Sequence, residues 1–215
     1  SADLERVKQA LAAAFATLPR EEVRVISTAA PHVCRESVQY VEDVLDVTQG
    51  KLGMGFSCGS DDMPALLMGN TLFGGSSNAK LFLNVREKLS LCYYASSLYH
   101  RQKGLITVSS GIEFQNYQRA YDEIMAQLEA VQKGELEDWE LEGARSTLLN
   151  SYATVGDSQG KLENFYLGQA ATGQHETPAD LARAIQDMTA ERICRAMSTV
   201  KLDTVYFLKG KEAEA

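Results

Sequence analysis

Two side chains between residues 72 and 97 have the chemistry of a hydrogen-bonding pair. Arg86 and Tyr93 are seven residues apart, and we expect a turn between them. A guanidinium stays charged and holds its donors rigidly, and a phenol adds one O–H donor. If the two meet, they could stabilise negative charge that grows on an oxygen atom of a bound molecule. The alternative is a solvated arginine at a helix end and a tyrosine at the rim of the core.

The elements that would position this pair follow from the local sequence. The run Gly74-Gly75-Ser76-Ser77 predicts a break, because glycine loses much freedom in a helix and serine competes for backbone hydrogen bonds. A second helix from Asn78 is indicated by apolar residues four apart: Leu81, Val85 and Leu89. A strand over residues 92 to 99 would then carry four residues on one face: Tyr93, Ala95, Ser97 and Tyr99.

Residues 74 to 97, GGSSNAKLFLNVREKLSLCYYASS, resemble the signature of the second domain of the M16 metallopeptidases. This family includes insulin-degrading enzyme, pitrilysin and the mitochondrial processing peptidase. Its members carry GG-x-S-S-x-LF-x-x-(V/L)R-E-K-x-G-L-x-Y at this point, and Ser90 stands where the family usually has glycine. Weaker similarity extends from about Leu4 to Leu208. The resemblance implies that residues 1 to 215 are a single domain of this type.

The resemblance also implies roles for particular residues. In the family, an Arg and a Tyr at the positions of Arg86 and Tyr93 help to hold the substrate carbonyl. We further assign Gly74, Gly75, Ser76 and Ser77 to substrate binding. The loop lacks the motifs of phosphate-binding loops, which argues against a nucleotide there. The family binds zinc through H-x-x-E-H in its first domain. This chain has no such motif, and its histidines, His32, His100 and His175, are expected as isolated loop residues.

Composition limits the remaining functions. The chain has 215 residues, of which 45% are hydrophobic, and this is enough for one large domain. Its net charge of −8 argues against a nucleic-acid partner. No apolar run approaches the roughly 18 residues of a membrane span, so no membrane association is expected. Four cysteines without C-x-x-C spacing, Cys34, Cys58, Cys92 and Cys194, indicate reduced thiols and a cytoplasmic location.

The order of elements predicts an α+β fold with a mainly antiparallel sheet and helices packed on it. An amphipathic helix should end before Pro19, and an irregular segment should cover residues 20 to 37. Strands are expected at 37 to 47, 50 to 58, 92 to 99, 105 to 112 and 204 to 208, before a solvated tail. Further helices are expected to begin at caps, namely Asp61-Asp62, Asp157 or Ser158, Thr177 and Thr189. The helix after Asp157 or Ser158 would carry an apolar stripe of Leu162, Phe165 and Tyr166. Gly53, Gly55 and Ser57 share one strand face, which suggests that a helix or a bound peptide comes close there.

The resemblance to the M16 family therefore implies that the chain is the second, zinc-free domain of an M16-type metalloendopeptidase that acts on peptides. No metal or other cofactor is expected on this chain, and zinc is expected on a companion domain or subunit that carries H-x-x-E-H. The alternative is a non-catalytic scaffold or partner subunit of the same family. The chain begins in mid-pattern, so we expect a fragment of a longer protein whose exposed apolar surface favours a homodimer.

Overall fold

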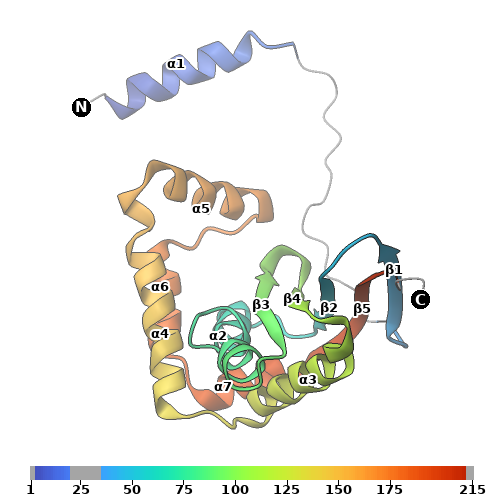
Figure 1. Cartoon of the computed structure of the whole chain (residues 1–215). Helices are drawn as coiled ribbons and strands as arrows, with labels where there is room; N and C mark the ends of the chain where they lie inside the picture. Colours follow the sequence, from blue (N-terminus) through green and yellow to red (C-terminus); the bar gives the residue numbers. More distant parts are fainter. Residues whose placement is uncertain (1–2, 20–34, 212–215) are drawn as a thin grey trace.

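The computed structural model describes residues 3–19 and 35–211, and its strands form one five-stranded sheet (Figure 1). The strands follow the order β1-β5-β2-β4-β3, and only the outer pair β1 and β5 is parallel. Their bounds are β1 Gln39–Leu45, β2 Gly50–Cys58, β3 Cys92–His100, β4 Leu105–Ile112 and β5 Val200–Gly210. The predicted α+β class with a mainly antiparallel sheet is therefore confirmed.

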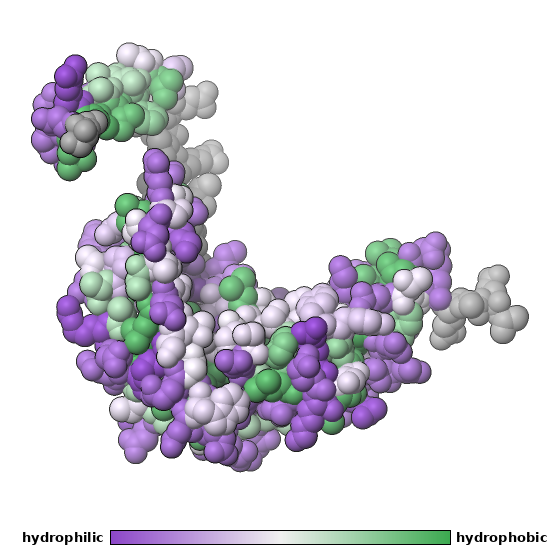
Figure 2. All heavy atoms as spheres, turned by 60° about the vertical axis from the view of Figure 1, so that its left-hand side comes forward, coloured by the Kyte–Doolittle hydropathy of each residue, from purple (hydrophilic) through white to green (hydrophobic). Residues whose placement is uncertain are grey.

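Most of the helices contribute side chains to the core on one side of this sheet (Figure 1). The first helix buries none of its residues, so its apolar side chains lie on the surface (Figure 2). Their bounds are α1 Leu4–Ala16, α2 Met63–Phe73, α3 Tyr117–Lys133, α4 Asp138–Ala153, α5 Gln159–Thr172, α6 Pro178–Gln186 and α7 Ala190–Met197. A π-helical segment, η1, covers Leu81–Lys88, and short 3₁₀ turns cover Arg101–Lys103, Phe114–Asn116 and Val155–Asp157. None of the helices in the described ranges is long and apolar enough to cross a membrane.

Side-chain caps explain where several of these helices begin. Asp62, Thr177 and Thr189 accept backbone N–H bonds at the starts of α2, α6 and α7, as their sequences predict. Of the two candidates for α5, Ser158 is the residue that caps the helix. Proline occupies the first turn of both α2 and α6, where its missing N–H leaves no bond unmade.

The two faces of the sheet differ sharply. On the helix-covered face, Met54 on β2 lies opposite Val108 on β4 and Val205 on β5, and all three are almost fully buried. On the other face, the nearest atoms to a side chain built at Gly53 or Gly55 would be 3.7 and 3.9 Å away. Those atoms belong to β5. The prediction that a helix packs against these glycines is therefore wrong, whereas a bound peptide at this face stays a prediction.

One buried ion pair joins the helices to the segment that carries Arg86. Lys80, just before η1, donates from Nζ to both carboxylate oxygens of Glu140 on α4, at 2.9 and 3.0 Å. Glu140 Oε2 also accepts the backbone N–H of Glu137 at 2.9 Å. Because both charged side chains are about nine-tenths buried, each depends on the other for its compensating charge.

The ends of the chain depart from the expectations in part. The predicted first helix is present and ends before Pro19, and none of its residues is buried. The last strand is longer than predicted and includes Lys209 and Gly210, which we expected in the solvated tail. Most of the expected irregular segment, 20 to 37, lies outside the described residues, as do His32, Cys34 and residues 212 to 215.

Candidate functional site

Arg86 lies near the end of η1, where the backbone is π-helical rather than α-helical. The N–H of Leu89 donates to the carbonyl of Asn84, five residues earlier, at 3.1 Å. Leu81 and Val85 are buried as predicted, whereas Leu89 is 37% exposed. Because a π-helical turn takes more residues than an α-helical one, a four-residue spacing does not keep Leu89 on the buried face.

The turn between η1 and β3 depends on an unusual backbone conformation at Ser90. Its φ of +50° is left-handed, and no other non-glycine residue of the described segments has a positive φ. The N–H of Leu91 then bonds to the carbonyl of Val85 at 3.0 Å, which reverses the chain. Glycine adopts this conformation without a Cβ penalty, so serine forms the same turn with some strain.

Tyr93 lies at a β-bulge, which the period-two pattern did not predict. The pairing of β3 with β4 shifts between Cys92 and Tyr94, so Tyr93 has no direct partner on β4. Tyr93 is 58% exposed, whereas Ala95 is 5% exposed. The prediction that these two residues share one face is therefore wrong, because the extra residue changes the alternation.

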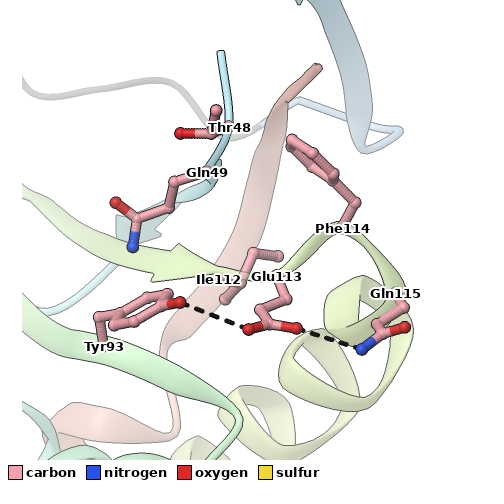
Figure 3. A pocket seen from close by; sticks show the side chains of 7 residues that line it. All are labelled: Thr48, Gln49, Tyr93, Ile112, Glu113, Phe114 and Gln115. Carbon is pink, nitrogen blue, oxygen red and sulfur yellow. Dashed lines mark hydrogen bonds between the residues drawn. The ribbon is translucent and has the colours of Figure 1, made fainter. Parts of the chain in front are cut away.

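Two hollows lie next to the bulge. The first, which we call the arginine hollow, has a volume of about 410 Å³. It is lined by Gly74, Gly75, Ser76, Ser77, Phe82, Arg86, Tyr94, Ala95, Ser96 and Ser97. The second, which we call the Glu113 hollow, has a volume of about 420 Å³ (Figure 3). It is lined by Thr48, Gln49, Tyr93, Ile112, Glu113, Phe114 and Gln115.

The structure thus brings Arg86 together with all four predicted loop residues and places Tyr93 in the neighbouring hollow. Tyr94, which sequence reasoning did not single out, is the tyrosine that lines the arginine hollow. The hydroxyl of Tyr93 donates to Glu113 Oε1 at 3.3 Å, a long hydrogen bond (Figure 3). Glu113 was not predicted, because a lone glutamate after a strand has no distinctive sequence pattern.

The guanidinium of Arg86 is accessible and only weakly paired. Its Cζ lies 4.8 Å from the centre of the Phe82 ring, and Nη1 lies 3.6 Å from Glu87 Oε1. The side chain of Arg86 is 41% exposed, and an ion pair this exposed contributes little. The aromatic ring restricts the arginine by a cation–π contact while leaving its donors free for a ligand.

Glycine is needed at the loop for reasons of space. A Cβ atom on Gly74 would lie 2.7 Å from Leu81 Cδ1 and 2.8 Å from the backbone nitrogen of Ser97. The carbonyl of Gly74 accepts the N–H of Ser97 at 2.8 Å, which attaches the loop to the outer edge of β3. On Gly75, a Cβ would lie 2.8 Å from Asn70 Nδ2. The loop is therefore fixed against β3.

The remaining candidate ligands are scattered. His100 Nε2 is 2.9 Å from Thr107 Oγ1, and His175 is an exposed residue between α5 and α6. In residues 3–19 and 35–211, no group of three or more His, Cys, Asp or Glu side chains could hold a metal ion. Cys58, Cys92 and Cys194 are free thiols, and burial raises the pKa of Cys58 to about 12.

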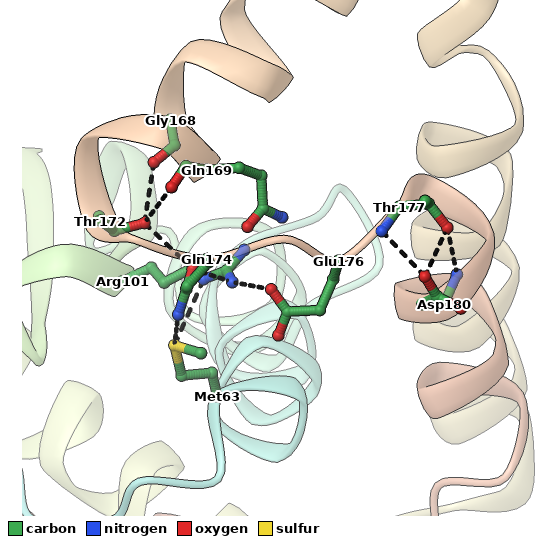
Figure 4. Close-up of polar contacts among 9 residues, drawn as sticks. All are labelled: Met63, Arg101, Gly168, Gln169, Thr172, Gln174, Glu176, Thr177 and Asp180. Atoms are coloured by element: carbon green, nitrogen blue, oxygen red, sulfur yellow. Dashed lines mark hydrogen bonds and ion pairs between the residues drawn. The ribbon is translucent and has the colours of Figure 1, made fainter.

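A polar cluster supports the far end of β3 (Figure 4). Arg101, in the turn after β3, donates from Nη2 to Gln174 Oε1 and lies 3.4 Å from Glu176 Oε2. Gln174 Nε2 in turn donates to the sulfur of Met63 at 3.4 Å. These contacts attach the β3–β4 turn to α2 and to the segment between α5 and α6.

The fold is shared with solved structures of other bacterial proteins. A conserved protein from Enterococcus faecalis V583 superposes with a TM-score of 0.84 at 28% identity, over 97% of this chain and 51% of that chain. The peptidase M16 inactive domain from Pseudomonas fluorescens superposes with a TM-score of 0.80 at 16% identity, over 100% of this chain and 53% of that chain. These similarities define the class of fold.

Residues 1–148 match the family described as the peptidase M16 inactive domain, and the chain belongs to this family. It is 38% identical over 217 residues to "Probable inactive metalloprotease YmfF" of Bacillus subtilis (strain 168), covering 98% of this chain and 50% of that protein. It is 22% identical over 154 residues to "Uncharacterized zinc protease YmxG" of the same strain, covering 69% of this chain and 38% of that protein. The chain thus spans half or less of these relatives, and the predicted family is confirmed.

Proposed function

We propose that this chain is the zinc-free half of an M16-type peptidase, and that Arg86 and Tyr93 bind the carbonyl oxygen of an extended peptide. Zinc on a companion domain or subunit would activate the water that attacks that carbonyl. The observation that carries the proposal is the arginine hollow, where an accessible guanidinium faces the outer edge of a β-strand.

The outer edge of β3 supports binding of a peptide in the arginine hollow. β3 is the last strand of the sheet, and the N–H of Ser97 points away from β4 toward Gly74. Because alternate residues of a strand direct their backbone groups to the same edge, Ala95 presents its N–H and carbonyl beside Ser97. An extended peptide that pairs with Ala95 would gain main-chain hydrogen bonds next to Arg86.

The charge and donors of the pair fit the proposed role. As the attacked carbonyl becomes tetrahedral, negative charge grows on its oxygen. The guanidinium of Arg86 and the hydroxyl of Tyr93 would then bind this oxygen more strongly than the ground-state carbonyl. Tyr93 would exchange its long hydrogen bond to Glu113 for a shorter one to the peptide.

The uncovered face of the sheet supports a companion half. Gly53, Thr107, Ser109 and Thr204 are small residues on this face beside the larger Tyr206, so a peptide could lie between this face and a second domain. The full protein, or an assembly of two subunits, would enclose its substrate in this way. We place it in the cytoplasm because the described cysteines are free thiols. One structural neighbour, PqqL from Escherichia coli, is named as a periplasmic protease.

A second function, that of a non-catalytic peptide-binding or scaffold subunit, rests on one observation. The chain is 38% identical to a Bacillus subtilis protein that is named a probable inactive metalloprotease. In such a subunit the hollows would hold peptide without contributing to its cleavage. The arrangement of Arg86 and Tyr93 supports either function, so activity has to distinguish them.

The test measures peptide hydrolysis and zinc content for the full-length protein, or for its mixture with a zinc-bearing partner. Arg86→Ala and Tyr93→Phe should each lower kcat by roughly 100-fold to 1000-fold, with zinc content unchanged. Arg119→Ala, which removes an exposed arginine on α3, is the matched control and should retain activity. Full activity in both variants would reject the carbonyl-binding role and favour the scaffold.

A further inference from the structure

The Glu113 hollow has the composition of a cation site. It combines one carboxylate, that of Glu113, which points toward Tyr93 and Gln115, with the aromatic rings of Tyr93 and Phe114 (Figure 3). Glu113 is the only charged residue among those that line the hollow, and no ion pair to it is present in the described part of the chain. A negative charge with aromatic neighbours and no cation is a favourable environment for a positive ligand group.

The carboxylate of Glu113 is oriented but not saturated. Its Oε1 accepts from the hydroxyl of Tyr93 at 3.3 Å, and its Oε2 accepts from Gln115 Nε2 at 3.1 Å. Both donors are neutral, and each carboxylate oxygen has a further lone pair for another donor. An ammonium or guanidinium group could therefore bind Glu113 through these lone pairs, and it would compensate for the bond that Tyr93 gives up when its hydroxyl turns to the peptide carbonyl.

Phe114 is held in place by two glycines at the ends of neighbouring strands. A Cβ atom on Gly210 would lie 2.8 Å from Phe114 Cζ, and one on Gly50 would lie 3.0 Å from Phe114 Cδ1. The ring thus occupies space that any side chain at these positions would take. It nevertheless remains 38% exposed, so part of it is available to a ligand.

We infer that the Glu113 hollow is a subsite for a lysine or arginine side chain of the bound peptide. The inference rests on the proposed function, because the peptide must lie along β3 for its side chain to reach the hollow. Tyr93 lines the Glu113 hollow and Tyr94 lines the arginine hollow, so one peptide can contact both. An acidic side chain would be repelled by Glu113, and an apolar one would desolvate its carboxylate without compensation.

The test uses peptides in matched pairs, arginine against citrulline and lysine against norleucine, at each of three positions on either side of the cleaved bond. The full-length protein or its assembly should cleave the basic member with a higher kcat/KM at one position, by roughly tenfold. Glu113→Gln should abolish most of that preference and leave the citrulline peptide nearly unaffected. Glu163→Gln on α5, another exposed glutamate, should preserve the preference.

A binding measurement separates this inference from the proposed function. Fluorescence anisotropy of the same labelled peptides reports the arginine-over-citrulline preference even if no assembly cleaves them, in which case only the catalytic role fails. Equal binding and equal kcat/KM for every matched pair would overturn the subsite. It would also be overturned if Glu113→Gln weakened both members of a pair equally, because Glu113 would then act only by positioning Tyr93.

Discussion

The two faces of the sheet are built from the same strands but have opposite properties. On the helix-covered face, Met54 packs against Val108 and Val205 with almost no exposed surface. On the uncovered face, Gly53 lies between Ser109 and Tyr206, and none of the described helices packs against Gly53 or Gly55. The comparison teaches that the covered face determines stability, whereas the uncovered face and the bulged end of β3 are available for binding.

The largest expected effect lies on the covered side, at the buried ion pair. Glu140→Ala should lower the free energy of unfolding by about 3–5 kcal/mol, because Lys80 would stay buried without a partner. Chemical denaturation measures this change. Glu129→Ala, which removes an exposed partner of Lys133, should cost less than about 1 kcal/mol. If both variants lost equal stability, the distinction between the two environments would be wrong.

Two glycine substitutions, one in the loop against β3 and one on the uncovered face, should change the free energy of unfolding in opposite directions. Gly74→Ala should destabilise by about 1–3 kcal/mol, because its Cβ would overlap Leu81 and the backbone of Ser97. Gly53→Ala on the uncovered face should be neutral or stabilising by about 0.5–1 kcal/mol, since the nearest atom is 3.7 Å away. Thermal and urea unfolding of both variants checks this. A destabilising Gly53→Ala would show that the uncovered face is more crowded than described.

The turn that leads into the bulge should be improved by glycine. Ser90→Gly should stabilise the chain by about 0.5–1 kcal/mol, because the left-handed penalty exceeds the added entropy of the unfolded chain. Ser96→Gly in the extended part of β3 is the control and should destabilise by about 0.5–1 kcal/mol. Equal losses in urea midpoint for the two variants would contradict the strained turn.

The smallest expected effect depends on pH. A hydrogen bond from Arg192 lowers the pKa of Asp62, and the positive charge of the Arg192 guanidinium lowers it further. Because the folded pKa is below the unfolded value of about 3.9, this stabilisation is complete above about pH 5 and is lost progressively as pH falls through the unfolded and then the folded pKa. Both side chains are partly exposed, so the contribution is less than about 1 kcal/mol. Asp62→Asn should flatten stability against pH below 4, and an unchanged acid slope would reject this contribution.

Much of the fold was predictable because its signals are local. Asp62, Thr177 and Thr189 are caps whose effect depends on the next three residues, and each begins a helix as predicted. The antiparallel sheet followed from the order of the elements. The apolar stripe of α5 was less informative, since Leu162 and Tyr166 are 39% and 47% exposed, and a pattern does not tell which partner will cover it.

The candidate site was predictable in its residues but not in its geometry. The family signature identified Arg86 and the glycine–serine loop, and the structure groups them in one hollow. The π-helical turn and the bulge were missed, because each adds one residue without changing the residue types around it. Glu113 was missed because its position depends on a fold-level contact with Tyr93, which is 20 residues away in sequence.

The bulge at Tyr93 interrupts the alternation of side chains between the two faces of β3. From Tyr94 to His100 the strand keeps its period of two, but the extra residue offsets Cys92 from this alternation. Two consecutive tyrosines can therefore serve two different hollows, which a regular strand would not allow on its exposed side. Deleting Cys92 would place Tyr93 opposite Ile112, on the same face as the buried Ala95, so the spacing of this segment matters as much as its composition.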